Sequence, residues 1–309
     1  MIIRTRNTDP AHNLALEQYL FESKKPGEVI IFLWQNDNTV VVGRYQNVFE
    51  EVNLQYAEEH GIKIVRRITG GGAVFHDLGN LNYSFIVDAL DDLDECNNKL
   101  IKAINGFGLN AYFEGRNDIF IDGYKVSGCA SCRENNKILY HGTLLVDSDL
   151  DALERVLTRN NKVTSKSVKS NPKQVKNITD FVEINIEDVS QAICGDEKIH
   201  EAEDNVRIDE LAHGRYNNKQ WTFGFPPNFN YKNSRRFKAG QICVNADISE
   251  GQLRKVKFSG DFIALRNIEE LEEQIKGYFI SASLKKFLCN FGDGFFLGIQ
   301  GKDIASLFQ

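Results

Sequence analysis

The stretch from which the rest of the chain can be read is Arg66-Arg67-Ile68-Thr69-Gly70-Gly71-Gly72-Ala73-Val74-Phe75-His76-Asp77. It lies between two predicted strands, residues 62–65 and 82–87, which are rich in β-branched and aromatic side chains. Three consecutive glycines free the backbone from Cβ atoms, so it can adopt positive φ angles and approach a ligand closely. Successive N–H groups in such a turn can converge on an anion, and two arginines add cations beside it. The stretch is either a glycine-rich hairpin turn with solvated arginines or a ligand site, and the flanking Arg-Arg and His-Asp pairs favour the ligand site.

This stretch does not match the common nucleotide-binding loops. A P-loop has a lysine at fixed spacing after its glycines, and a dinucleotide-binding loop opens a helix. Neither feature is present here. A Rossmann or P-loop fold is therefore not expected.

The segments around the stretch predict an α+β fold. Apolar residues recur at helical spacing over residues 13–21 after Asp9-Pro10, and two strands at residues 29–34 and 39–43 are joined by a polar turn. Because strands come in runs with helices between or beside them, we expect a mixed or antiparallel sheet flanked by helices. Hairpin turns are predicted at residues 122–123 and 135–136. The other predicted helices are residues 53–60, 94–106, 150–157 and 186–193, and the other strands are residues 119–121, 124–127 and 138–146.

The C-terminal part predicts a small separate α+β unit. Two strands at residues 240–248 and 253–260 precede two helices at residues 268–278 and 281–289. We therefore expect a catalytic domain over residues 1–233 and an accessory domain over residues 234–309.

Composition excludes several classes of protein. A formal charge of -6 argues against a nucleic-acid partner. No apolar run is long enough to span a bilayer, and the first residues lack the apolar core of a signal peptide. Six scattered cysteines in a chain of 309 residues are typical of a reducing compartment, so a cytoplasmic location is expected.

Three motifs then carry a family resemblance. Arg66-Arg67-x-x-Gly-Gly-Gly-Ala-Val-Phe-His-Asp-x-Gly-Asn resembles the central motif of the lipoate–protein ligases, which are grouped with biotin ligases and octanoyl transferases. Gly115-Arg116-Asn117-Asp118 followed by Gly123-Tyr124-Lys125-Val126-Ser127-Gly128 is similar to the family's lysine-bearing segment. Tyr140-His141-Gly142-Thr143-Leu144-Leu145 is similar to its His-Gly-x-Leu-Leu strand. The resemblance covers roughly residues 66–146 and implies the biotin/lipoate ligase catalytic fold with a C-terminal accessory domain.

The resemblance implies an ATP-dependent ligase that activates lipoate as lipoyl-AMP, with Mg²⁺, and passes the lipoyl group to a lysine of a carrier. The expected carrier is an apo lipoyl domain of a 2-oxoacid dehydrogenase E2 subunit or the glycine-cleavage H protein. An ATP-independent lipoyl or octanoyl transferase and a non-catalytic lipoate-binding protein are the alternatives. The Gly-Arg-Gly-Arg and Lys-Trp-Pro-Asn-Asp motifs of biotin ligases do not occur. The choice of carrier, lipoate or octanoate preference and oligomeric state stay open.

Lys125 is the predicted catalytic residue. A buried lysine is costly unless it meets an anion, and a carboxylate that becomes an acyl phosphate is such an anion. On residue type alone, Lys125 would be interpreted as an exposed strand lysine. The family resemblance instead favours a catalytic role for it. The resemblance implies nucleotide contacts by Arg67, Gly72, Ala73, Val74, Phe75, Asn117, Asp118, Lys125 and Lys166, with Asp118 also a magnesium ligand. It implies substrate contacts by Arg66, Gly71, His76, Lys125, Ser127, Gly128 and His141.

Residues 162–177 are polar and basic, which by composition indicates a flexible solvated loop. They resemble the family's Ser-Lys-Gly-x-x-Ser segment, which folds over the adenylate. Ser167 stands where glycine is usual and Gln174 where arginine is usual, so the contribution of this loop stays open.

Cys129 and Cys132 form a lone Cys-x-x-Cys. Half a zinc site, a redox pair, an acyl-carrying thiol and simple packing are the possible roles. No second Cys-x-x-Cys exists. We therefore expect both cysteines to be packing residues.

Overall fold

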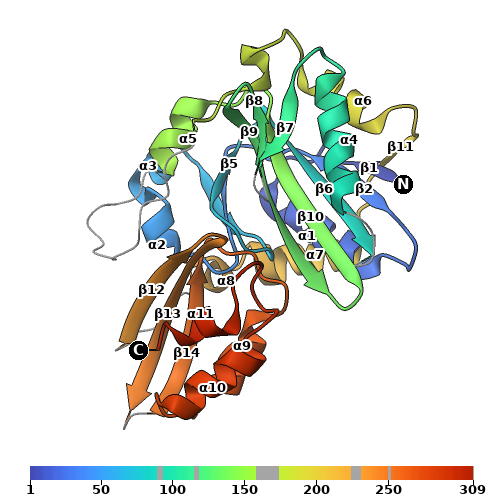
Figure 1. Cartoon of the computed structure of the whole chain (residues 1–309). Coiled ribbons are helices and arrows are strands. Elements are labelled where there is room, and N and C mark those ends of the chain that lie inside the picture. The colour runs from blue at the N-terminus through green and yellow to red at the C-terminus, as the bar shows by residue number, and fades with distance from the viewer. Residues whose placement is uncertain (89–92, 115–117, 158–173, 224–230, 250–251, 309) are drawn as a thin grey trace.

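The strand order of the main sheet is β11-β1-β2-β6-β10-β9-β8-β7 (Figure 1). It comes from a computed structural model that describes residues 1–88, 93–114, 118–157, 174–223, 231–249 and 252–308. β1 runs parallel to both of its neighbours and every other pair in this sheet is antiparallel, so the sheet is mixed. Its strands are β1 (Ile2–Arg4), β2 (Ile30–Trp34), β6 (Asn80–Asp88), β7 (Ala111–Glu114), β8 (Asp118–Ile121), β9 (Tyr124–Glu134), β10 (Lys137–Leu145) and β11 (Ile199–Glu201).

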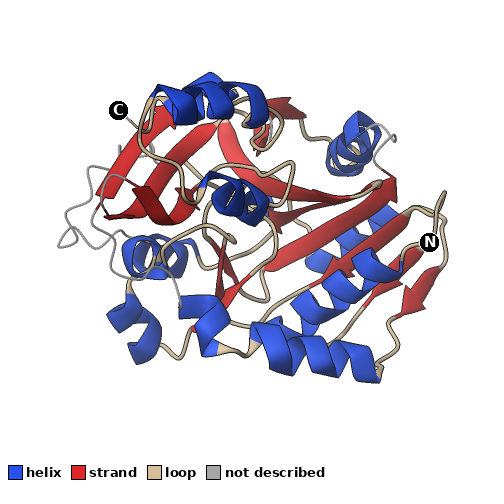
Figure 2. Ribbon diagram, turned by 90° about the horizontal axis from the view of Figure 1, so that it is seen from below, coloured by secondary structure: helices blue, strands red, loops and turns tan. Residues whose placement is uncertain are grey.

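Helices cover both faces of this sheet (Figures 1 and 2). α4 (Leu93–Asn105) and α6 (Ile186–Cys194) pack on one face with Tyr83 and Phe85 of β6. α1 (Pro10–Ser23) and α7 (Val206–Leu211), with a π-helical turn at Ala212–Tyr216, pack on the other face with Ile86. Successive strand side chains point to opposite faces, so the α4 face of β6 is apolar (Leu81, Tyr83, Phe85 and Val87), whereas its α1 face combines Ile86 with the buried polar residues Asn82 and Ser84.

Local signals fixed several element ends as predicted. Asp9 caps α1, because its carboxylate accepts hydrogen bonds from the backbone N–H groups of Ala11 and His12. Asp122 and Gly123 both have positive φ, and so does Asn135, at the two predicted hairpin turns. The α+β class and the flanked mixed sheet are confirmed.

The glycine-rich stretch is not a hairpin turn. β3 (Thr39–Val42) is the central strand of a three-stranded sheet, with β4 (Lys63–Arg66) parallel on one side and β5 (Val74–His76) antiparallel on the other. Residues 67–73 therefore cross the end of β3. β2 and β3 are consecutive in the sequence, but β2 belongs to the main sheet and β3 to this small sheet. The outer face of the small sheet packs on α2 (Val48–Glu51), α3 (Leu54–Glu59) and α5 (Leu150–Val156).

The C-terminal unit has its own sheet and core. Its strands are β12 (Tyr231–Phe237), β13 (Gly240–Ser249) and β14 (Gln252–Gly260), and its helices are α9 (Ile268–Ile275), α10 (Ala282–Phe291) and α11 (Gly301–Ala305). A helix α8 (Lys219–Phe223) and a 3-10 turn at Ile178–Asp180 complete the described elements. The predicted division near residue 233 lies inside β12, and it stays a prediction.

The sequence missed the short strands β1, β5, β7, β11 and β12, and it ended β9 too early. The five missed strands have three to seven residues each. β1, β5 and β11 pair with strands that are distant in the sequence, whereas β7 and β12 pair with the strand that follows each of them. Among the described residues, no helix combines the length and the apolarity that crossing a bilayer requires.

Candidate active site

Lys125 and Asp118 form an ion pair on one face of the main sheet, with 2.7 Å between Nζ and Oδ1. Both side chains are partly buried. In the β8–β9 ladder Asp118 pairs with Gly128, but a bulge then places Phe120 opposite Lys125. The extra residue in β9 turns the Lys125 side chain to the face of Asp118 and Gly128. Without this bulge, Lys125 and Gly128 would point to opposite faces.

Gly128 leaves the space that Lys125 occupies. A Cβ at Gly128 would lie 3.0 Å from Lys125 Nζ and 3.6 Å from Asp118 Oδ1. Ser127 does not share this face, because strand alternation turns its hydroxyl to the α4 side, where it lies 3.2 Å from Tyr83 Oη. A substrate contact by Ser127 stays a prediction, and this geometry does not favour it.

The chain returns to Lys125 after residues 158–173. The Lys125 N–H donates to Gln174 C=O (3.0 Å), and the Lys176 N–H donates to Lys125 C=O (3.1 Å). Val175 thus pairs with Lys125 as a parallel bridge. The predicted nucleotide contacts Asn117 and Lys166 lie outside the described residues.

The glycine-rich loop (residues 68–72) lies over the same face of the main sheet. A Cβ built on Gly71, whose φ is +86°, would lie 3.4 Å from Ala130 Cβ, and Ala130 shares a face of β9 with Gly128. Two residues along a strand span roughly 7 Å, so the loop and Lys125 border one site. The loop also passes directly over Gly43, where any Cβ would overlap the Gly71 carbonyl oxygen.

Arg67 is the internal support of the loop. Its guanidinium donates to the Thr69 hydroxyl and to the carbonyls of Val41, Gly70 and Gly72. The side chain is buried, and burial lowers its pKa to about 10, so it stays charged at neutral pH. The predicted phosphate contact of Arg67 stays a prediction. It would require Arg67 to exchange carbonyl partners for phosphate oxygens.

Arg66 braces the surrounding chain in a similar way. Its guanidinium donates to the carbonyls of Gly43, Arg44, Gln46, Trp221 and Thr222. Burial lowers the pKa of Arg66 to about 10. A substrate contact by Arg66 stays a prediction that this geometry does not favour, because its donors already have acceptors.

His76 is a neutral hydrogen-bond donor that is buried beside Asn36 and Trp34. Asn13 Nδ2 donates to Asn36 Oδ1, which leaves Asn36 Nδ2 to donate to His76 Nδ1 (3.1 Å). Burial lowers the pKa of His76 to about 3, so the single proton is on Nε2, which is buried and has no protein partner among the described residues. Asp77 does not pair with it, since its carboxylate accepts from the N–H groups of Gly79 and Asp149. His76 and Asp77 therefore do not form a hydrogen-bonded pair that could act as a general base in the described structure.

His141 connects the sheet to the loop. Its Nδ1 lies 2.7 Å from Glu17 Oε1, and its Nε2 lies 2.7 Å from Thr69 Oγ1. Glu17 also accepts from Ser84 Oγ (2.5 Å). Sequence reasoning missed Glu17 and Thr69. One signal was available: a carboxylate inside the apolar run Leu14-Ala15-Leu16-Glu17, where a buried charge needs a partner.

The two cysteines pack on opposite sides of the sheet. Cys129 belongs to the cluster under α4, and Cys132 to the cluster under α1. Both are free, and this separation excludes a disulfide between them. Cys129 Sγ donates to Tyr140 Oη (2.8 Å), and burial raises its pKa to about 12. The expectation that they are packing residues agrees with this environment.

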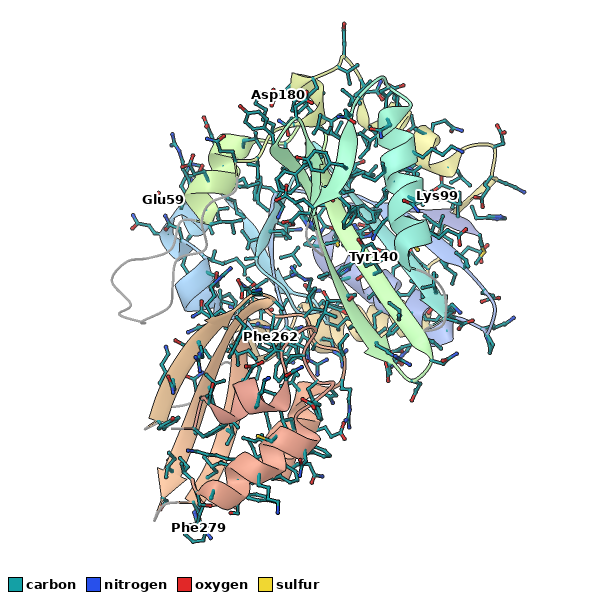
Figure 3. The ribbon with its side chains drawn as sticks, viewed as in Figure 1. Glu59, Lys99, Tyr140, Asp180, Phe262 and Phe279 are labelled. Atoms are coloured by element: carbon teal, nitrogen blue, oxygen red, sulfur yellow. The ribbon has the colours of Figure 1, made fainter. Side chains whose placement is uncertain are left out.

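The C-terminal unit contacts the loop directly, which the sequence did not indicate. The Gly71 N–H donates to Phe262 C=O (2.9 Å), and the Phe262 ring stacks on Tyr45 at 4.9 Å between ring centres. Arg44 Nη2 lies 3.3 Å from Glu269 Oε1. Figure 3 shows Phe262 at the junction of the two parts, whereas Phe279 lies at the far end of the C-terminal unit.

The three residues after the glycine-rich loop pack into the hydrophobic cores. Phe75 is buried in the core of the small sheet, Ala73 packs against that core, and Val74 packs on the α1 side. Among the described residues, no group of three His, Cys, Asp or Glu side chains is arranged to hold a metal ion. A dedicated protein metal centre is thus not found in the described ranges.

Comparison with known proteins gives matches over both parts of the chain. Residues 9–196 match the lipoyl protein ligase A/B catalytic domain, and residues 226–308 match the bacterial lipoate protein ligase C-terminus. Lipoate–protein ligase 1 of Staphylococcus aureus is 35% identical over 285 residues, which cover 87% of this chain and 87% of the relative.

Two solved structures are also similar. The structure of P. falciparum LipL1 in complex with lipoate has a TM-score of 0.82 at 22% identity and covers 93% of this chain and 92% of its own, which supports the fold. A lipoate–protein ligase A bound with ATP has a TM-score of 0.60 at 27% identity, covering 73% of this chain and 98% of its own. With these matches over both parts, the chain belongs to the lipoate–protein ligase family.

Proposed function

We propose that this protein is an ATP-dependent lipoate–protein ligase. The observation that carries the proposal is the Lys125–Asp118 ion pair beside the glycine-rich loop, in a chain of this family. The name of the S. aureus relative, lipoate–protein ligase 1, supports lipoate as one substrate. The similar ligase structure bound with ATP supports ATP as the other.

In the first step a lipoate carboxylate oxygen attacks the α-phosphorus of ATP. A P–O bond forms, pyrophosphate leaves, and lipoyl-AMP results. Negative charge builds up on the α-phosphate, and a fixed cation in a site shielded from water stabilises it most strongly. Lys125 is the residue for this role, because its ammonium is partly buried and held by Asp118 at 2.7 Å. Gly128 keeps the space beside Nζ open.

In the second step a lysine amine of the acceptor attacks the carbonyl carbon of lipoyl-AMP. An amide forms, AMP leaves, and the amine loses a proton. The proposed substrate contacts on the protein are the backbone at Gly71 and Gly128 and the neutral Nε2–H of His76. His141 is proposed to line the acyl pocket, because both of its ring nitrogens already have protein partners. His76 is suited to donate a hydrogen bond to an anionic oxygen, because its Nε2–H is buried without a protein acceptor in the described residues.

Magnesium fits this site through Asp118. Mg²⁺ commonly binds one or two carboxylates and completes its shell with water and nucleotide phosphates. One carboxylate next to the proposed phosphate position meets that need, although Asp118 also holds Lys125. Bound there, the ion would neutralise phosphate charge. Asn117 and Lys166 remain proposed nucleotide contacts from the sequence.

The acceptor is proposed to be an apo lipoyl domain of an E2 subunit or the glycine-cleavage H protein. Which of these is used, and the cytoplasmic location, stay predictions from the sequence. A nucleic-acid partner is not proposed for a chain with a formal charge of -6.

The protein should modify an apo lipoyl domain only when lipoate and Mg-ATP are both supplied, because adenylation provides the activated acyl group. Intact-mass spectrometry of the acceptor, with assays for AMP and pyrophosphate, measures this. Modification without ATP from an acyl carrier thioester would instead indicate the transferase. Lipoate binding in calorimetry without pyrophosphate release would indicate the binding protein.

A further prediction separates the ligase from a thiol-based transferase. Cys129→Ser should retain most of the activity, and iodoacetamide at pH 8 should leave Cys129 unlabelled. With a pKa of about 12, only about one thiol in ten thousand is ionised at that pH, and the thiolate is the reactive form. Labelling of Cys129 should increase as pH rises, because the thiolate fraction grows. Peptide mass spectrometry measures labelling, and the exposed Cys289 is the positive control.

A hydroxylamine-sensitive acyl adduct on Cys129, together with an inactive Cys129→Ser variant, would contradict the ligase mechanism. Cys132→Ala should also stay active, because Cys132 packs on the other side of the sheet.

A further inference from the structure

Two chains of hydrogen bonds end on the same buried carboxylate, Glu17. One begins at Trp34, whose indole N–H donates to Ser84 Oγ (3.0 Å), and Ser84 donates to Glu17 Oε1. The other runs from the glycine-rich loop through Thr69 and His141 to the same oxygen. Glu17 is 1% exposed and Ser84 is fully buried, so water does not replace these partners.

The donors and acceptors of the second chain assign its protons. Arg67 Nε–H donates to Thr69 Oγ1 (2.9 Å), so the Thr69 hydroxyl is left with its own proton to donate to His141 Nε2. His141 then carries its proton on Nδ1 and donates it to Glu17. Every group in the chain is satisfied when His141 is neutral and Glu17 is ionised.

This arrangement also balances charge. The Arg67 guanidinium is surrounded by carbonyl oxygens and one hydroxyl, and in the described part of the chain none of its hydrogen-bond acceptors is a carboxylate. Glu17 is the nearby anion that favours the charged form of Arg67. Arg67 in turn holds the carbonyls of Gly70 and Gly72. The carboxylate on α1 is thus connected to the backbone of the glycine-rich loop through β10.

We propose that Glu17 is a positioning residue, which acts through His141, Thr69 and Arg67 to hold the glycine-rich loop in the shape that binds the nucleotide. The inference rests on the proposed function for its ligand, ATP. Its structural half, the hold on the loop, does not depend on which reaction the protein catalyses.

Glu17→Gln keeps the size of the side chain and removes its charge. We expect the KM for ATP to rise about tenfold, with a much smaller change in kcat and in the KM for the acceptor domain. Glu22→Gln is the matched control, because Glu22 lies on the same helix, is partly exposed, and accepts from Gln18 (2.6 Å). It should leave all three constants unchanged.

Thr69, at the other end of the hydrogen-bond chain from Glu17, provides a second test. Thr69→Val removes the hydroxyl and should raise the KM for ATP as Glu17→Gln does, whereas Thr69→Ser should restore near-normal values. The double variant Glu17→Gln/Thr69→Val should be no worse than the poorer single variant, because both break one connection. Additive losses would overturn the proposal. The Thr69 pair also decides the question if Glu17→Gln fails to fold.

Hydrogen exchange of the ligand-free protein separates this inference from the proposed function. The amide of Gly71, which donates to Phe262 C=O, should exchange about tenfold faster in Glu17→Gln than in Glu22→Gln. Wild-type protein without ligase activity would reject the proposed function and leave this readout intact. The contrary result would be that the two glutamine variants have the same Gly71 exchange rate and the same KM for ATP, while Glu17→Gln has only a lower melting temperature. Glu17 would then be a structural residue and not a positioning residue.

Discussion

Replacing Lys125 by alanine should slow lipoate-dependent pyrophosphate exchange by about a hundredfold or more. One fixed charge facing the developing charge of a transition state in a shielded site is worth about 3 kcal/mol, and each 1.36 kcal/mol is a factor of ten in rate. The Lys125 ammonium is the cation that the β9 bulge turns towards Asp118, beside the glycine-rich loop. Exchange of labelled pyrophosphate into ATP measures this first step alone.

The Lys125→Ala variant should still fold. The Lys125 side chain is partly exposed and its ion pair with Asp118 lies at the site, so the core is not disturbed. Lys137→Ala is the control, because that lysine is also on the main sheet but donates to the carbonyls of Phe21 and Glu22 away from the site. Pyrophosphate exchange near the wild-type rate in Lys125→Ala would remove Lys125 from the mechanism.

Replacing Arg66 by methionine should lower the free energy of unfolding by at least about 3 kcal/mol. Methionine fills a similar volume but donates nothing, so five carbonyls lose the partner that holds them, including those of Gly43 and Thr222. Each buried group left unsatisfied costs about 1–3 kcal/mol, less where water enters. Urea denaturation followed by circular dichroism measures the loss.

Arg66→Lys should also be unstable, since an ammonium has three donors and cannot reproduce the planar fork. Arg207→Met is the control, because the Arg207 side chain is half exposed and forms ion pairs with the surface carboxylates of Glu22 and Glu210. If Arg66→Met were as stable as Arg207→Met, the carbonyl contacts of Arg66 would not contribute to the free energy of unfolding.

The sequence determined the features that depend on neighbouring residues. Asp9-Pro10 starts α1, and Asp122-Gly123 and Asn135-Asn136 turn hairpins, because capping and positive φ are properties of a few adjacent residues. The three ordered motifs identified the family, which the matches over residues 9–196 and 226–308 confirm. The mixed sheet with flanking helices followed from the order of strands and helices.

The tertiary structure decided where the motif residues point. Ser127 and Gly128 are adjacent in the sequence, yet strand alternation puts them on opposite faces, and one bulge decides that Lys125 joins Gly128. No residue-level pattern marks the bulge. The sequence therefore selected the segment of the site but not the face of the sheet.

The role of the two arginines was also decided by tertiary structure. The sequence placed Arg66 and Arg67 beside a ligand, because cations next to glycines are typical of anion sites. In the fold, Arg66 bonds to carbonyls 20 to 23 residues before it and 155 or 156 residues after it. Glu17 likewise meets His141 at a separation of 124 residues. The partners of Arg66 come together only when β3, β4 and α8 pack, and Glu17 meets His141 only when α1 packs on β10, so no local rule could predict these hydrogen bonds.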